Sequence, residues 1–167
     1  MTQGGWARNC INEQRDLFPR TDAAVIVSII DDQDRILLGS QGSWQENRWS
    51  VLAGFVEAAE SLEAAVKREM FEESGLHVSE PEYLGSQAWP YPYSLMLAFR
   101  AKVDSSNSAE DIKADGLEIA KLRWFSRADI KQEAPQMLLP TKISIARVMI
   151  ENWYGEEIVS ATELSGN

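Results

Sequence analysis

Three glutamates, Glu69, Glu72 and Glu73, lie within five residues of one another in the segment LEAAVKREMFEESG. Ser61 is a good N-cap and Gly75 is placed to end a helix in the left-handed conformation, so the sequence predicts a helix between them. At about 100° per residue, Glu69 and Glu73 continue the apolar stripe that faces the core, and Glu72 lies at its margin.

This placement favours a metal site. An acidic pair on a helix ordinarily belongs to a solvated face, so the alternative to a metal site is an acidic surface without a functional role. Partly buried carboxylates within about 6 Å of one another, however, repel and take up protons unless a cation lies among them. Carboxylates at positions i, i+3 and i+4 suit a hard cation, and no His or Cys accompanies them. The pattern therefore predicts Mg²⁺ or Mn²⁺ rather than zinc.

The rest of the chain alternates strand and helix signals without repeats. Strands are expected at residues 23–30, 35–40, 49–56, 82–89, 94–103 and 119–125, and an amphipathic helix at 141–153. A turn rich in aspartate joins the first two strands as a hairpin. This tally predicts an α+β fold, an α/β/α sandwich around a mixed sheet.

Composition limits the possible functions. With 167 residues, the chain suits one domain with a sizeable core. The net charge of −10 argues against a sequence-indifferent nucleic-acid binder, and no apolar run is long enough for a membrane span. The single cysteine, Cys10, cannot form an internal disulfide. We therefore expect a soluble, cytoplasmic protein without membrane partners.

The segment from Gly54 to Leu76 resembles the Nudix box, G-x5-E-x7-R-E-U-x-E-E-x-G-U with U apolar, at every specified position. The matching residues are Gly54, Glu60, Arg68, Glu69, Met70, Glu72, Glu73, Gly75 and Leu76. The resemblance implies the same sandwich fold. It also implies Mg²⁺- or Mn²⁺-dependent hydrolysis of a nucleoside diphosphate linked to another moiety.

The same resemblance implies roles for the box residues. Glu69, Glu72 and Glu73 would be metal ligands. Glu73 or a neighbour would also help to activate water, Arg68 would orient the cluster, and Gly54 would let the loop backbone approach the site. Metals that bridge a pyrophosphate neutralise developing charge and lower the pKa of the attacking water, so the chemistry agrees with the pattern.

A second motif, SQAWPYPYS, narrows the substrate. On composition alone it could be a proline-stiffened loop whose aromatic residues cap the core. It resembles S-Q-P-W-P-F-P-x-S of the NADH pyrophosphatase (NAD-capped RNA hydrolase) subgroup, with Ala88 for the first proline and Tyr91 for the phenylalanine. By this resemblance Trp89, Tyr91 and Ser94 would contact the substrate, and the two replacements would affect fine selectivity.

Four further residues are implied by the resemblance, each with a structural alternative. Phe55 would stack on nicotinamide, or is a core residue. Phe18 would reach a partner subunit's site, or packs within its loop. Glu118 matches a late metal-binding carboxylate, or is a solvated loop acid. Ala146 would lie near the adenine, or serves helix packing.

The N-terminal stretch resembles a junction between a four-cysteine zinc ribbon and the catalytic domain. Cys10 stands alone, with Glu13 where a second cysteine would fall, so we expect no zinc. Either the chain is part of a longer protein or its lineage has lost the ribbon. The predicted organisation is a junction remnant at 1–20, a hydrolase domain at 21–154 and a fraying tail at 155–167.

The resulting expectation is an enzyme, in the form of a homodimer, that splits the pyrophosphate of NADH or NAD⁺ into (reduced) nicotinamide mononucleotide and AMP. Its substrates would include the 5′ end of NAD-capped RNA. One alternative is a pyrophosphatase for ADP-ribose or a nucleotide sugar. The other is a non-catalytic module that senses a dinucleotide, which the intact box carboxylates disfavour.

Overall fold

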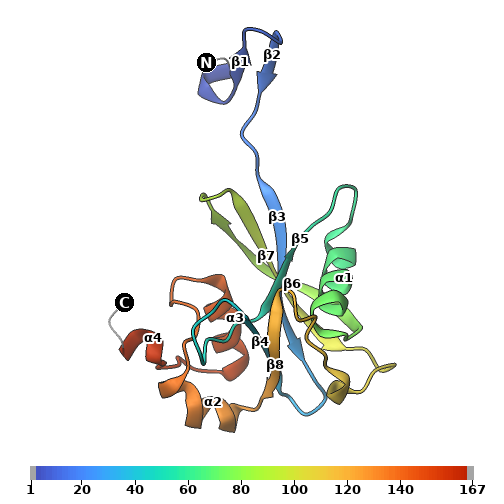
Figure 1. The fold of residues 1–167 in the computed structure, drawn as a ribbon, viewed down its shortest axis with the longest axis vertical. Helices are drawn as coiled ribbons and strands as arrows, with labels where there is room; N and C mark the ends of the chain where they lie inside the picture. Colours follow the sequence, from blue (N-terminus) through green and yellow to red (C-terminus); the bar gives the residue numbers. More distant parts are fainter. Residues whose placement is uncertain (1–2, 165–167) are drawn as a thin grey trace.

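A mixed six-stranded sheet forms the centre of the computed structural model, which describes residues 3–164 (Figure 1). Its strands are β3 (Asp22–Ile30), β4 (Ile36–Gln41), β5 (Leu52–Phe55), β6 (Val78–Trp89), β7 (Ser94–Val103) and β8 (Ile119–Phe125). Two short strands, β1 (Arg8–Cys10) and β2 (Arg15–Leu17), form a separate hairpin. The helices are α1 (Leu62–Ser74), α2 (Arg127–Glu133), α3 (Ile145–Tyr154) and α4 (Ala161–Leu164), with 3₁₀ turns at Gln3–Gly5, Ala109–Asp111 and Ala134–Gln136.

The strand order is β6-β7-β3-β4-β8, and β5 also pairs with β3. β3 and β7 run parallel, whereas the other pairs are antiparallel. The predicted mixed sheet and the predicted hairpin of the first two sheet strands are therefore confirmed.

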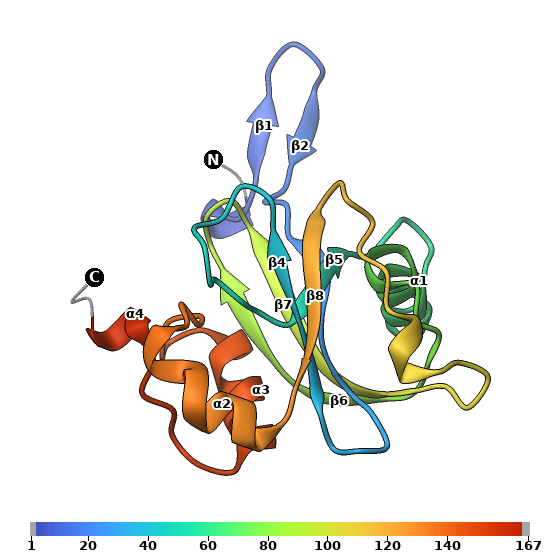
Figure 2. The same ribbon diagram turned by 60° about the horizontal axis from the view of Figure 1, so that its bottom comes forward.

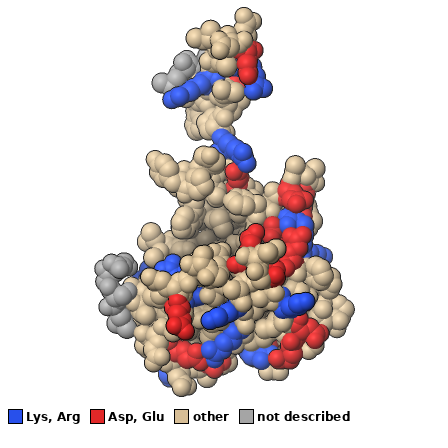
Figure 3. All heavy atoms as spheres, in the orientation of Figure 1, with Lys and Arg blue, Asp and Glu red and all other residues tan. Residues whose placement is uncertain are grey.

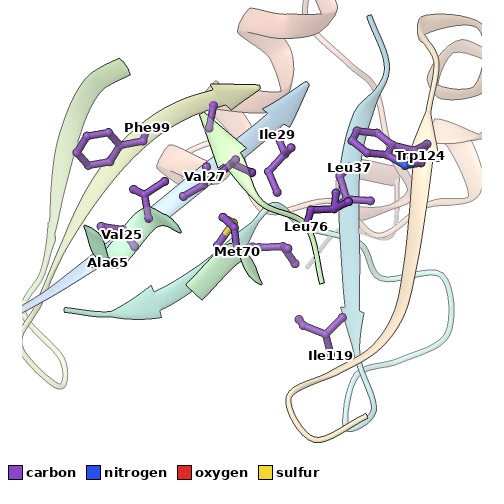
Figure 4. Packing of buried hydrophobic residues seen from close by; sticks show 14 residues of the cluster. Val25, Val27, Ile29, Leu37, Ala65, Met70, Leu76, Phe99, Ile119 and Trp124 are labelled. Carbon is purple, nitrogen blue, oxygen red and sulfur yellow. The ribbon is translucent and has the colours of Figure 1, made fainter. Parts of the chain in front are cut away.

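Alternation along β3 explains why helices cover both faces of the sheet. Val25 packs in one apolar cluster with Met70 of α1, and Figure 4 shows this cluster from close by. The next residue, Ile26, packs in a second cluster with Ile150 of α3. Successive strand side chains point to opposite faces. Figures 1 and 2 show α1 on one side of the sheet and α2 and α3 on the other, which confirms the α/β/α sandwich.

Helix α1 has the predicted bounds. The Ser61 hydroxyl accepts a hydrogen bond from the backbone N–H of Ala64 at 3.2 Å. Gly75 has φ 72°, and its N–H donates to the carbonyl of Phe71 at 2.8 Å. The last large helix, α3, instead begins at Ile145, four residues later than expected. The reason is that Ser144 caps it, accepting from the N–H of Ala146 at 3.2 Å.

The fraying tail expected from residue 155 onward is wrong for residues 158–164. Ile158 and Ser160 are buried, and the Ser160 hydroxyl donates to Glu163 at 2.6 Å. The fully buried guanidinium of Arg147 pairs with Glu163 at 3.1 Å. These contacts fasten the segment, including α4, to α3. Positions 165–167 of the expected tail lie outside the described residues.

The N-terminal hairpin stands away from the body on the connector at residues 18–21 (Figure 1). Its large apolar side chains are exposed, with Trp6 at 74% and Ile11 at 86%. Cys10 is a free thiol. Within the described residues, no helix is both long enough and apolar enough to cross a membrane.

Candidate active site

Helix α1 directs two carboxylates inward and leaves a third at the rim. Glu73 is 4% exposed, and the Glu69 side chain is 14% exposed. The side chain of Glu72 is 58% exposed. This agrees with the stripe predicted from helical periodicity, in which Glu72 lies at the margin.

Gly54 brings the backbone of β5 against these carboxylates. It pairs with Val25 in the antiparallel ladder between β5 and β3. A Cβ atom at Gly54 would lie 1.9 Å from Cδ of Glu69, well inside van der Waals contact. Only glycine therefore fits, because any side chain would displace Glu69.

Arg68 ties the site together. Its guanidinium donates two hydrogen bonds to Glu60, at 2.9 and 2.8 Å, which is a bidentate arrangement. It also donates to Glu69 at 2.8 Å and to Glu72 at 3.0 Å. A further bond, at 2.9 Å, reaches the carbonyl of Phe55. The hydrogen bonds from Arg68 lower the pKa of Glu60 to about 2, and those to Glu60 raise the pKa of Arg68.

Glu73 lies in surroundings that oppose its ionisation. Burial raises its pKa to about 8, and the charges of Glu69, Glu118 and Asp115 add to this effect. The backbone of Ala53 hydrogen-bonds to the carboxylate and partly offsets it. Its Oε2 atom is buried without a hydrogen-bond partner. Burial also raises the pKa of Glu69.

These observations fit a hard divalent cation. A buried carboxylate oxygen without a hydrogen-bond partner, among like charges, requires a proton or a cation. All the candidate ligand atoms are oxygens, which suits a hard cation. Glu118 is held nearby by a loop in which Asp115 accepts from three backbone N–H groups, including that of Glu118 at 3.1 Å. Within residues 3–164, no group of three or more His, Cys, Asp or Glu side chains lies in an arrangement that could hold a metal ion. The predicted metal-ligand roles therefore stay predictions.

The second motif lines a cavity of about 230 Å³. Trp89, Tyr91 and Ser94 all contribute to its wall, so the structure brings these three predicted residues together. Sequence reasoning missed the other lining residues, which are Ile26, Pro92, Met96, Ser144 and Ile145. They are ordinary apolar and small residues without a pattern of their own, although Pro92 lies inside the motif.

The remaining predicted residues lie at separate places. Ala146 is buried and lines an adjoining cavity, which shares Ile26 and Ser144 with the first. Phe55 is 58% exposed next to Gly54, so its alternative as a core residue is wrong. Phe18 is 62% exposed on the connector, and it lines neither cavity.

Gln87 connects the motif to the start of α3. Its amide nitrogen donates to the carbonyl of Ile143 at 2.7 Å. Its amide oxygen accepts from the N–H of Ile145 at 2.9 Å and from the indole of Trp89 at 3.0 Å. Sequence reasoning assigned this residue no role, although its place in SQAW was a usable signal.

Comparison with known proteins agrees with this geometry. Residues 19–147 match the NUDIX domain. The chain belongs to the Nudix family. Among solved structures, a NUDIX hydrolase from Nitrosomonas europaea is similar with a TM-score of 0.67 and 22% identity, covering 89% of this chain and 81% of that one. This likeness supports the Nudix fold.

Two named Nudix relatives are similar over most of the chain. The NAD-capped RNA hydrolase NudC of Mycobacterium tuberculosis is 43% identical over 161 residues, covering 90% of this chain and 50% of the relative. The NAD-capped RNA hydrolase NUDT12 of Homo sapiens is 35% identical, covering 90% of this chain and 35% of the relative. The chain thus spans half or less of these relatives' length.

Proposed function

We propose that this Nudix chain hydrolyses the pyrophosphate bond of NADH and NAD⁺, giving (reduced) nicotinamide mononucleotide and AMP, and that it removes NAD caps from RNA. One arrangement of the site around the sheet carries the proposal. The carboxylates of α1 meet the backbone of Gly54, and the Trp89 cavity opens on the other side of the same sheet. The names of the relatives similar at 43% and 35% identity support this choice of substrate.

Glu69, Glu72, Glu73 and Glu118 would hold Mg²⁺ or Mn²⁺. Such a cation, when bound, supplies Lewis-acid polarisation of the pyrophosphate and neutralises its charge. Glu73 has a free Oε2 atom and would take the proton of the attacking water. Arg68, through its hydrogen bonds to Glu60 and Glu69, would hold that carboxylate set in place.

Aromatic side chains would hold the nicotinamide end. Trp89 and Tyr91 wall a cavity whose other lining is mostly apolar, which suits a flat ring. Phe55 exposes its ring directly after Gly54, and a stacked base there would lie next to the pyrophosphate site.

The test is an end-point assay of NADH, NAD⁺, ADP-ribose and NAD-capped RNA with purified protein, separating products by chromatography. We expect NADH to be split into the two mononucleotides with Mg²⁺ or Mn²⁺ and not in excess chelator. Preferred hydrolysis of ADP-ribose would replace the proposal by the first alternative. Tight binding without hydrolysis of any of the four would replace it by the sensor alternative.

We further propose a cytoplasmic homodimer. The lone cysteine supports a reducing compartment. The N-terminal segment exposes apolar side chains at Trp6, Ile11 and Phe18, and a second copy of the chain would cover them. Phe18 would then reach the cavity of the partner subunit.

A further inference from the structure

The connection between β7 and β8 brings one more carboxylate, Asp115, to the edge of the candidate site. The backbone N–H of Lys113 donates to the carbonyl of Ser74 at 2.8 Å, which fastens this connection to the end of α1. Burial is the main cause of the raised pKa of Glu73, and the charges of Glu118 and Asp115 add to it, so both carboxylates lie near that group. Figure 3 shows acidic side chains gathered over α1. Sequence reasoning assigned Asp115 no role.

The carboxylate of Asp115 closes a tight turn. Its Oδ1 atom accepts from the N–H of Leu117 at 3.1 Å and from that of Ile119 at 2.8 Å. Its Oδ2 atom accepts from the N–H of Glu118 at 3.1 Å. The N–H of Gly116, which has φ 75°, donates to the carbonyl of Ile119 at 3.0 Å. Because three N–H groups already occupy its two oxygens, Asp115 is better placed to shape this backbone than to bind a cation.

Glu118 depends on this turn for its position. Its side chain is exposed and has no hydrogen-bond or ion-pair partner within residues 3–164. The place from which its carboxylate can reach a cation is therefore set by its backbone. The next residue, Ile119, is buried in the same apolar cluster as Met70 of α1, which fixes one end of the turn. The hydrogen bonds to Asp115 fix the other end.

We propose that Asp115 is a positioning residue that holds Glu118 within reach of the cation that Glu69 and Glu73 would bind. Hydrogen bonds that orient a metal ligand commonly change metal affinity by about 10- to 100-fold when they are removed. The inference rests on the proposed function in one respect, which is that it takes Glu118 as a ligand of the cation. It adds a residue that acts on the cation through another side chain.

The first test measures the affinity of the purified protein for Mn²⁺ by isothermal titration calorimetry, without substrate. Asp115→Ala is expected to lower this affinity about tenfold. Asp115→Asn is expected to keep most of it, because the variant retains an oxygen for the N–H groups of Leu117 and Ile119. The matched control is Asp104→Ala at the other end of the same connection, where Asp104 accepts from the N–H of Ser106 at 2.9 Å. The melting temperature of each variant shows that it is folded.

A double-mutant cycle separates positioning from a direct effect of charge. Glu118→Gln should itself lower the affinity for Mn²⁺, and adding Asp115→Ala to it should cause no further loss, because the side chain that Asp115 positions no longer binds the cation. Additive losses, or equal losses in Asp115→Ala and Asp115→Asn, would assign Asp115 a direct electrostatic or ligand role and overturn the inference. Unchanged affinity in Asp115→Ala or in Glu118→Gln would overturn it as well.

The outcome is independent of the substrate, because Mn²⁺ binding is measured without NADH. If the wild type binds Mn²⁺ and the cycle shows the expected coupling, the inference stands even where NADH is not hydrolysed, and only the proposed function fails. If NADH is hydrolysed, Asp115→Ala should raise the Mg²⁺ concentration that gives half of the maximal rate and keep most of the rate at saturating Mg²⁺. A lower rate at saturating Mg²⁺ with an unchanged Mg²⁺ requirement would contradict the positioning role.

Discussion

Glu73 is an ionisable group in surroundings that disfavour its charge. Its pKa in the unfolded chain is about 4.3, whereas burial raises it to about 8 in the fold. The folded state therefore retains a proton that the unfolded state loses. By linkage, the free energy of unfolding of the metal-free protein falls as the pH rises from about 4.5 to about 8 and changes little through Glu73 above that.

Glu73→Gln tests the effect of this carboxyl group on stability and on turnover. In chelator at pH 8.5 the variant is expected to melt several degrees above the wild type, since 1 kcal/mol is worth about 2–4 °C at this chain length. At pH 4, where Glu73 is protonated in the fold and largely protonated in the unfolded chain, we expect little difference. Turnover with Mg²⁺ should fall by about two to four orders of magnitude. The control is Glu63→Gln, an exposed acid in the first turn of the same helix. A variant that melts below the wild type at pH 8.5 would contradict the argument.

Gly54 acts by having no side chain. Gly54→Ala places a Cβ atom where Glu69 now lies, so the carboxylate must move. We expect turnover of NADH to fall at least tenfold, together with a loss of about 1–3 kcal/mol of stability from overpacking. Gly42→Ala is the matched control because its Cβ would meet nothing closer than Ala120, at 3.6 Å. Full activity of Gly54→Ala would show that the position of Glu69 is not critical.

Phe55 is expected to separate substrates that share a pyrophosphate. Base stacking on an aromatic side chain is worth about 1–3 kcal/mol, or roughly ten- to a hundredfold in affinity. Phe55→Ala should raise KM for NADH by that factor. KM for ADP-ribose, which lacks nicotinamide, should change much less. Phe71→Ala removes another exposed ring, at 48% against 58% for Phe55, from the far face of α1 and should affect neither KM. Equal effects of Phe55→Ala on both substrates would assign Phe55 to another role.

At the scale of elements, prediction succeeded where local physics decides the structure. Helix α1 has a hydroxyl cap, a left-handed glycine stop and a clear stripe, so its bounds followed from the sequence. β7 and β8 also have their predicted bounds. Helices α2 and α4 were not predicted. Seven- and four-residue helices carry too few turns for a periodic signal, and their stability comes from long-range contacts.

The candidate site, like the elements, was predictable only where local sequence decides the structure. The inward placement of Glu69 and Glu73 followed from helical periodicity, because both lie on one continuous element. The wall of the Trp89 cavity could not be found in this way. It combines Ile26 with Ser144, which are distant in sequence and meet only because α3 packs on the sheet. Residues brought together by tertiary packing leave no local pattern.

Arg147 of α3 shows what the unpredicted C-terminal segment with α4 contributes. Its guanidinium is fully buried, pairs with Glu151 at 2.8 Å and donates to the carbonyl of Pro140 at 2.9 Å. Thr162, in α4, donates to the carbonyl of Leu139 at 2.7 Å. The C-terminal segment thus braces the stretch that carries Leu139, Pro140 and Ser144, all of which line the cavity that adjoins the Trp89 cavity.

Arg147→Met should therefore destabilise the fold and loosen this wall. Breaking a buried ion pair costs about 3–5 kcal/mol, because Glu151 and Glu163 lose the cation that neutralises them and the carbonyls of Pro140 and Ile158 lose a donor. Thermal unfolding should show a clear drop in melting temperature, and at temperatures where the variant is folded KM for NADH should rise more than kcat falls. Arg127→Met, which removes a partly exposed arginine on α2, is the control. A variant with a lower melting temperature and unchanged KM would limit Arg147 to stability.

At the scale of the whole molecule, the hairpin is the part that the single chain explains least. Two three-residue strands are marginal on their own, and this pair stands away from the sandwich with its apolar side chains exposed (Figure 1). A second copy related by two-fold symmetry would cover both hairpins by equal contacts and create two equal sites. The expected particle in light scattering is a dimer.

Complementation tests whether Phe18 acts across such a dimer. Phe18→Ala should weaken NADH binding, and Glu73→Gln should abolish turnover, so each homodimer is impaired for a different reason. After the two variants are mixed under conditions that exchange subunits, each mixed dimer contains one site with an intact Glu73 and, from the other copy, an intact Phe18. At NADH concentrations well below KM, about a quarter of the wild-type activity should then appear, because half of the dimers are mixed and each has one complete site. Native mass spectrometry of the mixture, with one variant isotope-labelled, shows whether half of the dimers contain one copy of each variant. No recovery in a mixture whose subunits have exchanged would place Phe18 in the site of its own chain or in none.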